Sequence, residues 1–150
     1  MKIRAATSAD IDTLRALEQQ VVAAERPFNE AIKTVDAIYY DLDAMLSDTN
    51  THLIVGEKDN QIVATGYAQI RPSKAQLVHE HHGYLGFMLV LPEYRGQGLN
   101  QQVMEHLIEW CKGQNINDFY LDVYSANEAA IRAYEKAGFT PCLLEMKLHL

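Results

Sequence analysis

Residues 84–100 read YLGFMLVLPEYRGQGLN, and this stretch decides the fold. Its first part, residues 84–91, is a continuous apolar run, which predicts a strand buried on both faces. The run ends at a proline, and two glycines follow within a few residues. Apolar residues then recur at helical spacing and predict a helix over 98–112: Leu99, Val103, Leu107 and Trp110.

The turn between this strand and helix has the composition of an anion site. The first turn of a helix has unpaired N–H groups and a partial positive charge. Gly96 and Gly98 let a ligand approach the backbone, and Arg95 adds a full charge. These features suit a phosphate or pyrophosphate, although an ordinary tight turn is the alternative. The stretch matches neither G-x-x-x-x-G-K-[ST] nor G-x-G-x-x-G, which disfavours ATP and NAD.

The rest of the chain shows alternating strand and helix patterns without a linker, repeat or low-complexity segment. The strand–helix–strand unit over 84–124 predicts a right-handed parallel crossover, and the strands before it pair as antiparallel neighbours. We therefore expect one domain over 1–150 with an α/β (α+β) fold and a mixed sheet. Further strands are expected over 2–6, 52–57, 61–70, 118–124 and in the tail CLLEMKLHL; further helices over 9–25, 34–47 and within 125–138, the last starting with a Ser125–Glu128 capping box.

Composition excludes several classes of protein. The chain is 48% hydrophobic and 22% charged, which is ordinary for a globular domain. Its formal net charge of −7 argues against nucleic acid as the main partner. The first residues lack the apolar segment of a signal peptide, and no apolar run could span a bilayer. Cys111 and Cys142 both lie in apolar stretches and are expected to be buried thiols. These features predict a cytoplasmic protein that does not bind membranes.

A second stretch with chemical potential is NEAAIRAYEKAGF, residues 127–139. Asn127 and Tyr134 are seven residues apart, so they share one helix face at about 10.5 Å along the axis. In one interpretation Asn127 caps the helix and the Tyr134 ring packs with Ala130 and Ala137. In the other, both side chains line a cleft.

Together, V-x-P-E-Y-R-G-x-G and N-x-x-A-x-x-x-Y-x-x-x-G-F resemble the GCN5-related N-acetyltransferase superfamily, over nearly the whole chain. The resemblance implies a mostly antiparallel sheet in which two parallel strands, 84–91 and 118–124, splay apart around acetyl-CoA. It implies that the pantetheine arm pairs with the backbone near Leu89 and Val90, and that Asn127 contacts this arm. Tyr134 would be the general acid toward the departing thiolate. The pyrophosphate would bind backbone N–H groups of Arg95, Gly96, Gln97, Gly98, Leu99 and Asn100.

Two features depart from the family pattern. The last motif position holds Asn100, whose side chain either crowds the cofactor or donates to a phosphate. The region after Phe139 has room for one long strand or two very short strands, where the family usually has two. A second copy of the chain could cover the resulting sheet edge, as a homodimer.

The acceptor side is less defined. A base must take a proton from the amine, and Glu80, then His81, is the first candidate, because the family often has a glutamate near the start of the central strand. Strand alternation places His79 and His81 on one face and Glu80 and His82 on the other. A solvated loop is the plain alternative, and a metal site is disfavoured because HEHH lacks HExxH spacing.

The family resemblance also implies that residues 26–45 cover the acceptor. Tyr39, Tyr84 and Tyr124 are the expected substrate-binding residues, and acidic and aromatic groups there could bind an amine. A charged outer face is the alternative for this region. The acceptor is expected to be a small-molecule or peptide amine, with no metal involved.

Three functions follow. The first is an acetyl-CoA-dependent N-acetyltransferase in which the amine attacks the thioester directly, since no Cys–His pair supports an acyl-enzyme. The second is a CoA-binding regulatory or sensor module without turnover. The third is an interaction protein without a small ligand.

Overall fold

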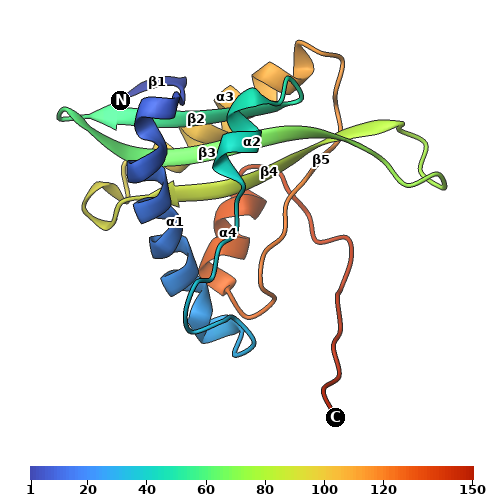
Figure 1. The fold of residues 1–150 in the computed structure, drawn as a ribbon. Helices are drawn as coiled ribbons and strands as arrows, with labels where there is room; N and C mark the ends of the chain where they lie inside the picture. Colours follow the sequence, from blue (N-terminus) through green and yellow to red (C-terminus); the bar gives the residue numbers. More distant parts are fainter.

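The computed structural model describes all 150 residues and has one five-stranded sheet between two helical layers. Strand order is β1-β2-β3-β4-β5, with antiparallel neighbours except for the parallel pair β4 and β5. The predicted mixed and mostly antiparallel sheet is confirmed (Figure 1). The strands are β1 Lys2–Ala5, β2 Thr51–Lys58, β3 Gln61–Pro72, β4 His81–Val90 and β5 Phe119–Tyr120; the helices are α1 Ile11–Glu25, α2 Leu42–Ser47, α3 Leu99–Lys112 and α4 Glu128–Lys136.

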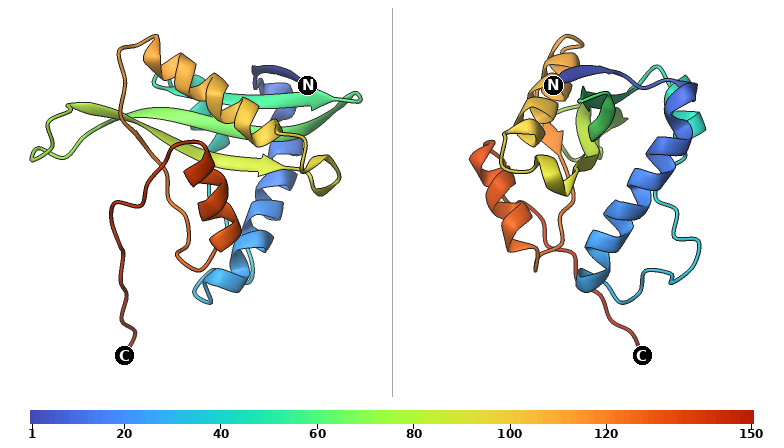
Figure 2. Two further views of the ribbon diagram at one scale, coloured as in Figure 1. Left: turned by 180° about the vertical axis from the view of Figure 1, so that it is seen from behind. Right: turned by 90° about the vertical axis from the view of Figure 1, so that its left-hand side faces the viewer.

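Each face of the sheet has its own hydrophobic core. Helix α1 covers one face, and α3 and α4 cover the other, as the edge-on view in Figure 2 shows. On the α1 face, Leu14 and Leu42 are fully buried against residues such as Phe87. On the opposite face, Val103 and Leu107 of α3 pack on the sheet. None of the helices has the length and apolar character that a membrane-spanning helix requires.

A bulge in β4 shapes the middle of the sheet. The register with β3 shifts between Thr65 and Tyr67, and Phe87 opposite has a positive φ of 53°. The buried Thr65 hydroxyl donates to the Phe87 carbonyl at 2.8 Å, which holds this bend. On its other side, β4 pairs with β5 only at Gly83 and Tyr84. From there toward its C-terminal end, β4 therefore has no strand neighbour on the β5 side.

The structure corrects two expectations near the middle of the chain. The helix predicted over 34–47 begins only at Leu42, because the buried Glu18 carboxylate binds the backbone N–H groups of Tyr39 and Tyr40 and holds them outside a helix. The run 84–91 is also not buried throughout, since only every second residue of the strand is fully buried. Leu85 is buried on the α3 side, and Phe87 and Leu89 beyond the bulge are buried on the α1 side.

The C-terminal region differs most from the prediction. The strand expected over 118–124 has two paired residues, and the last strand is absent: the tail extends away from the body (Figure 1). β5 is the edge strand, and its two paired residues offer a tail strand few backbone groups with which to pair. Cys142 lies in this tail and is exposed rather than buried, whereas Cys111 is buried as predicted. The α4 cap is Asn127 instead of Ser125, because the helix begins two residues later than expected.

Candidate active site

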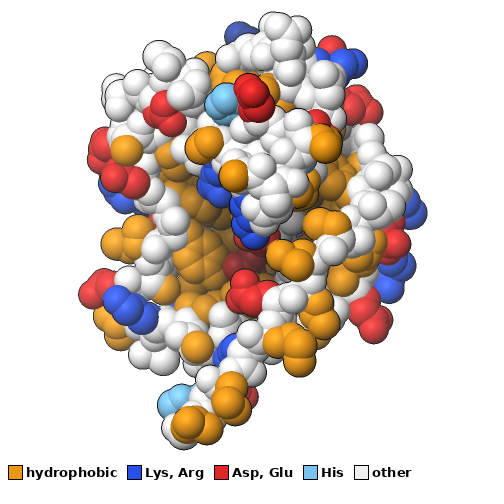
Figure 3. All heavy atoms as spheres, turned by 90° about the vertical axis from the view of Figure 1, so that its right-hand side faces the viewer, with side chains coloured by type: hydrophobic (Ala, Val, Ile, Leu, Met, Phe, Trp, Pro, Cys, Tyr) orange, Lys and Arg blue, Asp and Glu red, His pale blue; other side chains and the backbone are white.

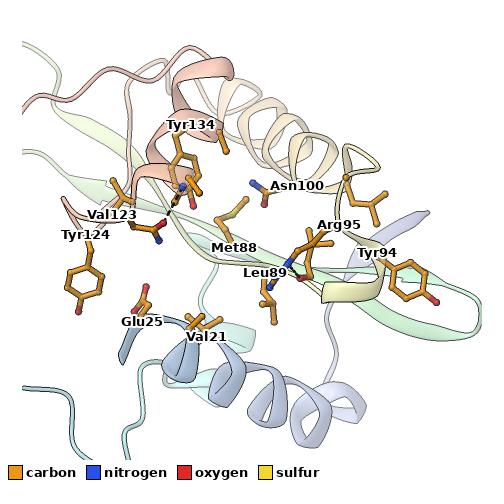
Figure 4. Close-up of a pocket in the computed structure, with 18 of the residues that line it drawn as sticks. Val21, Glu25, Met88, Leu89, Tyr94, Arg95, Asn100, Val123, Tyr124 and Tyr134 are labelled. Carbon is orange, nitrogen blue, oxygen red and sulfur yellow. Dashed lines mark hydrogen bonds between the residues drawn. The ribbon is translucent and has the colours of Figure 1, made fainter. Parts of the chain in front are cut away.

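A cavity of about 430 Å³ lies where β4 and the segment after β5 separate. Its walls come from the end of α1, the second half of β4, the turn before α3, residues 122–124 and α4. Figure 3 shows the hydrophobic lining of this hollowed face, with acidic and basic side chains gathered around it. Figure 4 shows the side chains that converge on the cavity from these elements.

One end of the cavity is the N-terminus of α3. Gly96 and Gly98 have positive φ angles of 79° and 75°, a conformation that side chains other than glycine adopt rarely. Gly98 is the N-cap and offers no side-chain hydrogen bond, so the first-turn N–H groups stay available. A Cβ at either glycine would meet no atom within 4 Å, so both face open space. Uncapped N–H groups with partial positive charge can bind a phosphate.

The side chains around this helix end differ in orientation. Arg95, whose Nε donates to the Val90 carbonyl at 3.3 Å, lines the cavity, as does Asn100, which lies beside it in Figure 4. Leu99 lines it as well, although its side chain packs in the core. The Gln97 side chain does not line the cavity, because its Oε1 accepts a hydrogen bond from Lys58 at 2.7 Å.

The centre of the cavity is the unpaired edge of β4. Leu89 and Val90 both line it, and their strand pairs with β3 but not with β5 at this point. Backbone groups on the open edge are therefore available to an extended ligand, which is the arrangement that strand addition uses.

Helix α4 supplies the opposite wall. Asn127 both caps this helix, accepting from the Ala130 N–H at 3.2 Å, and lines the cavity, so the two interpretations of this residue are compatible. Tyr134 projects into the same space and packs edge-on against Phe139. Burial, with a smaller contribution from the charge of Glu25, raises the pKa of the Tyr134 phenol above its ordinary value. This phenol therefore keeps its proton at neutral pH.

Two carboxylates that were not among the predicted site residues lie at the other end of the cavity. Glu25 comes from the end of α1, and Asp122 follows β5. The Tyr84 hydroxyl donates to Asp122 at 2.9 Å, and the Tyr124 hydroxyl, which lines the cavity, accepts from Asn29 at 2.9 Å. The polar row formed by Tyr120, Asp122 and Tyr124 was the available sequence signal for Asp122. Nothing in the local sequence marked Glu25.

Tyr39 lies near this end, in a neighbouring hollow between the loop before α2 and β3. Its hydroxyl is buried without a hydrogen-bond partner. Burial, followed by interaction with Glu25, raises the pKa of this phenol. The structure thus brings the three tyrosines predicted to bind substrate, Tyr39, Tyr84 and Tyr124, to the surroundings of the two carboxylates.

Glu80 and His81 are not part of this site. Both are exposed at the start of β4, whereas the cavity is lined by Met88, Leu89 and Val90 of the same strand. The nearest cavity residue on this side is Asp122, which bonds to Tyr84, and at about 3.3 Å per residue Tyr84 lies roughly 10–13 Å along the strand from His81 and Glu80.

The histidines around them also do not alternate as predicted, because His79 precedes the strand. Ser73 Oγ lies 2.7 Å from His79 Nδ1 and 2.9 Å from His82 Nδ1, so these two rings share one partner. No group of three or more His, Cys, Asp or Glu side chains has the arrangement of a metal site.

Comparisons with known proteins match this geometry. The model of the Acetyltransferase (GNAT) family matches residues 17–139. In Bacillus subtilis, the uncharacterized N-acetyltransferase YobR is 38% identical over 64 residues, covering 43% of this chain and 26% of that protein. A putative [ribosomal protein bS18]-alanine N-acetyltransferase of the same organism is 29% identical over 108 residues, covering 72% and 64%. The chain thus spans about a quarter of the length of the first relative and less than two thirds of the length of the second.

A solved structure shares the fold. A predicted acetyltransferase from Clostridium acetobutylicum, determined with acetyl-CoA, superimposes with a TM-score of 0.80 at 21% identity, covering 99% of this chain and 95% of that chain.

Proposed function

The chain belongs to the acetyltransferase (GNAT) family, and we propose that it transfers an acetyl group from acetyl-CoA to an amine. The observation that carries this proposal is the cavity itself, which joins the uncapped end of α3 to a half-buried, protonated Tyr134 along the open edge of β4. An anion site, an extended backbone edge and a proton donor follow one another in the order that pyrophosphate, pantetheine and thioester require.

The residues present suit acetyl-CoA, which supplies the activated acetyl thioester when bound. The N–H groups after Gly96 and Gly98, together with Arg95, would hold the pyrophosphate by charge-assisted hydrogen bonds. The open backbone edge at Leu89 and Val90 would hold the extended arm. Asn100 is only partly buried at the cavity wall, which supports an interpretation in which its amide donates to the cofactor rather than blocks it.

Tyr134 is our candidate for the general acid. Its position on the α4 wall and its raised pKa support a phenol that stays protonated until a thiolate leaves. Proton donation at this point makes the thiolate a better leaving group.

Glu25 and Asp122 are our candidates for the acceptor end. An incoming amine is cationic at neutral pH and must lose a proton before it attacks, so a nearby carboxylate both attracts it and accepts that proton, directly or through water. We assign this role to these two cavity carboxylates in place of Glu80 or His81.

Direct attack by the amine is supported by the positions of the thiols. Cys111 is buried in α3 and Cys142 lies in the tail, and neither lines the cavity. A covalent acyl-enzyme would need a nucleophile beside the thioester. We further propose that the chain works in the cytoplasm, where free thiols persist, and as a homodimer that covers its exposed tail.

The test is the variant Tyr134→Phe, with Tyr120→Phe as a matched loss of a phenol outside the cavity. We expect Tyr134→Phe to lower the rate of CoA release with an amine panel by roughly 10²- to 10⁴-fold, the typical contribution of a general acid, while CoA affinity is kept. Tyr120→Phe should leave both close to wild type. A regulatory CoA-binding module predicts CoA binding without turnover in any of the three proteins. Equal rates for wild type and Tyr134→Phe would remove the phenol from the mechanism.

A further inference from the structure

A second hollow of about 420 Å³ lies next to the acceptor end of the cavity, between the loop before α2 and β3. Tyr39, Tyr40 and Tyr67 give it an aromatic wall, and Arg71 from the end of β3 gives it a positive charge. Tyr67 crosses the neighbouring strand over Gly86, where a Cβ would come within 2.5 Å of its ring. The shape of the hollow therefore depends on Tyr67 in β3 and on the absence of a side chain at Gly86 in β4.

Arg71 is held in place but is not neutralised. Its Nε donates to Gln69 at 2.7 Å, and its guanidinium lies over the Tyr84 ring, 3.8 Å from the centroid. No Asp or Glu lies within ion-pair distance of it. A positioned guanidinium without a carboxylate partner is a site for a planar anion, which it binds through two parallel N–H groups.

The acidic residues of this hollow are already engaged elsewhere. Asp41 caps α2 by accepting from the Ala44 N–H at 3.1 Å. Asp48 accepts from the Thr51 hydroxyl at 2.7 Å and from the Asn50 N–H. Neither carboxylate is paired with Arg71, so its charge remains available to a ligand.

Tyr84 connects this charge to the acceptor end of the cavity. One side of its ring carries the Arg71 guanidinium, and its hydroxyl donates to Asp122 at 2.9 Å. A cation site at Asp122 and an anion site at Arg71 therefore lie one phenol ring apart, on the same side of the sheet as α1 and α2.

We propose that Arg71 binds a carboxylate of the acceptor, so that the acceptor is an amine that also carries a carboxylate. The inference rests on the proposed acetyl transfer and specifies its substrate class. The amine lies at Asp122 and the carboxylate at Arg71, and the separation suits one or two amino-acid residues at roughly 3.3–3.6 Å each. Short peptides and ω-amino acids have this arrangement of charges.

The experiment compares acceptors that differ only in this carboxylate. CoA release from acetyl-CoA is measured with glycylglycine against glycylglycinamide, with 4-aminobutyrate against its amide, and with cadaverine as an amine without a carboxylate. The proteins are wild type, Arg71→Gln and Lys74→Gln, which removes the same charge from the adjacent exposed loop. Acetyl-CoA binding by each protein is measured separately by thermal shift.

We expect wild type and Lys74→Gln to prefer the carboxylates by roughly 10- to 100-fold in kcat/KM, the range of a charge-assisted hydrogen bond, and Arg71→Gln to lose this preference. Acetylation of cadaverine or the amides at rates equal to the carboxylates would overturn the inference and leave the proposed function standing. A preference that survives in Arg71→Gln would have the same effect, as would acetylation of cadaverine or the amides but of neither carboxylate. Absence of acetyl-CoA binding would overturn both.

Discussion

Glu18 is a buried carboxylate without a basic partner, and it decides the path of the chain before α2. Its side chain is 1% exposed, and its Oε2 accepts from the Tyr39 and Tyr40 N–H groups at 3.1 and 2.8 Å. The loop that it holds brings the Tyr40 ring onto Phe87, with 4.6 Å between centroids. We expect Glu18→Ala to release this loop and destabilise the protein.

The magnitude follows from the two hydrogen bonds. Each bond to a charged acceptor contributes about 1.5–3 kcal/mol, and the variant also avoids burying a carboxylate, so we expect a loss of about 3 kcal/mol. For a chain of this size the midpoint of thermal unfolding should fall by roughly 6–12 °C. Glu18→Gln places a neutral oxygen where both N–H groups can still donate, and should lose only about 1 kcal/mol.

Denaturant unfolding of wild type, both variants and Gln20→Ala measures these differences. Gln20→Ala changes an exposed residue of the same helix and should unfold close to wild type. An alanine variant within about 0.5 kcal/mol of wild type would refute the reasoning, since that is the effect of an ordinary surface substitution. A glutamine variant as unstable as the alanine variant would show that the hydrogen bonds accepted by this side-chain oxygen do not account for the stability that Glu18 provides.

Three further predictions concern the cavity, a histidine pair and the tail. Gly98→Val should weaken acetyl-CoA binding at least tenfold by isothermal titration, because φ is 75° there, whereas Gly113→Ala, at φ −61°, should not. Burial and then the charge of His106, whose Nε2 lies 3.3 Å from His52 Nε2, lower the pKa of His52. The contribution of His52 to stability is therefore complete above about pH 6.5 and is lost as pH falls through the folded-state pKa. Between pH 7.5 and 5.5 the melting temperature of His52→Gln should fall less than that of wild type, and an equal fall would contradict this. Deleting residues 141–150, which expose four leucines and a methionine, should convert a dimer to a monomer in light scattering, and an unchanged mass would count against tail-mediated association.

Residues with strong local patterns were predictable. The spacing of apolar residues in α1 and α3, and the apolar runs on either side of the KDN turn in β2 and β3, placed those elements within two residues at every end. The glycine-rich turn was recognisable because only a few residue types allow a positive φ beside an open helix end. Tyr134 and Asn127 were found because helical spacing keeps them on one face.

The failures have one physical cause, which is contact between segments distant in sequence. The stripe of Val35, Ile38 and Leu42 looked helical, but Glu18 binds the loop from another helix. The cavity carboxylate Glu25 comes from an element end that carries no local signal, and only the fold brings it to Asp122 and Tyr134. The tail has the alternation of a strand but no neighbouring strand in the monomer with which to pair.

The central claim is that this cavity binds acetyl-CoA, and a thermal shift experiment tests it most directly. Wild-type protein is heated with acetyl-CoA, CoA or ATP. At a hundredfold excess over Kd a ligand stabilises the folded state by about 2.7 kcal/mol. For a chain of this length that is a shift of roughly 5–11 °C. We predict this shift with acetyl-CoA and with CoA, and none with ATP. No shift with acetyl-CoA or CoA, or an equal shift with ATP, would contradict the account.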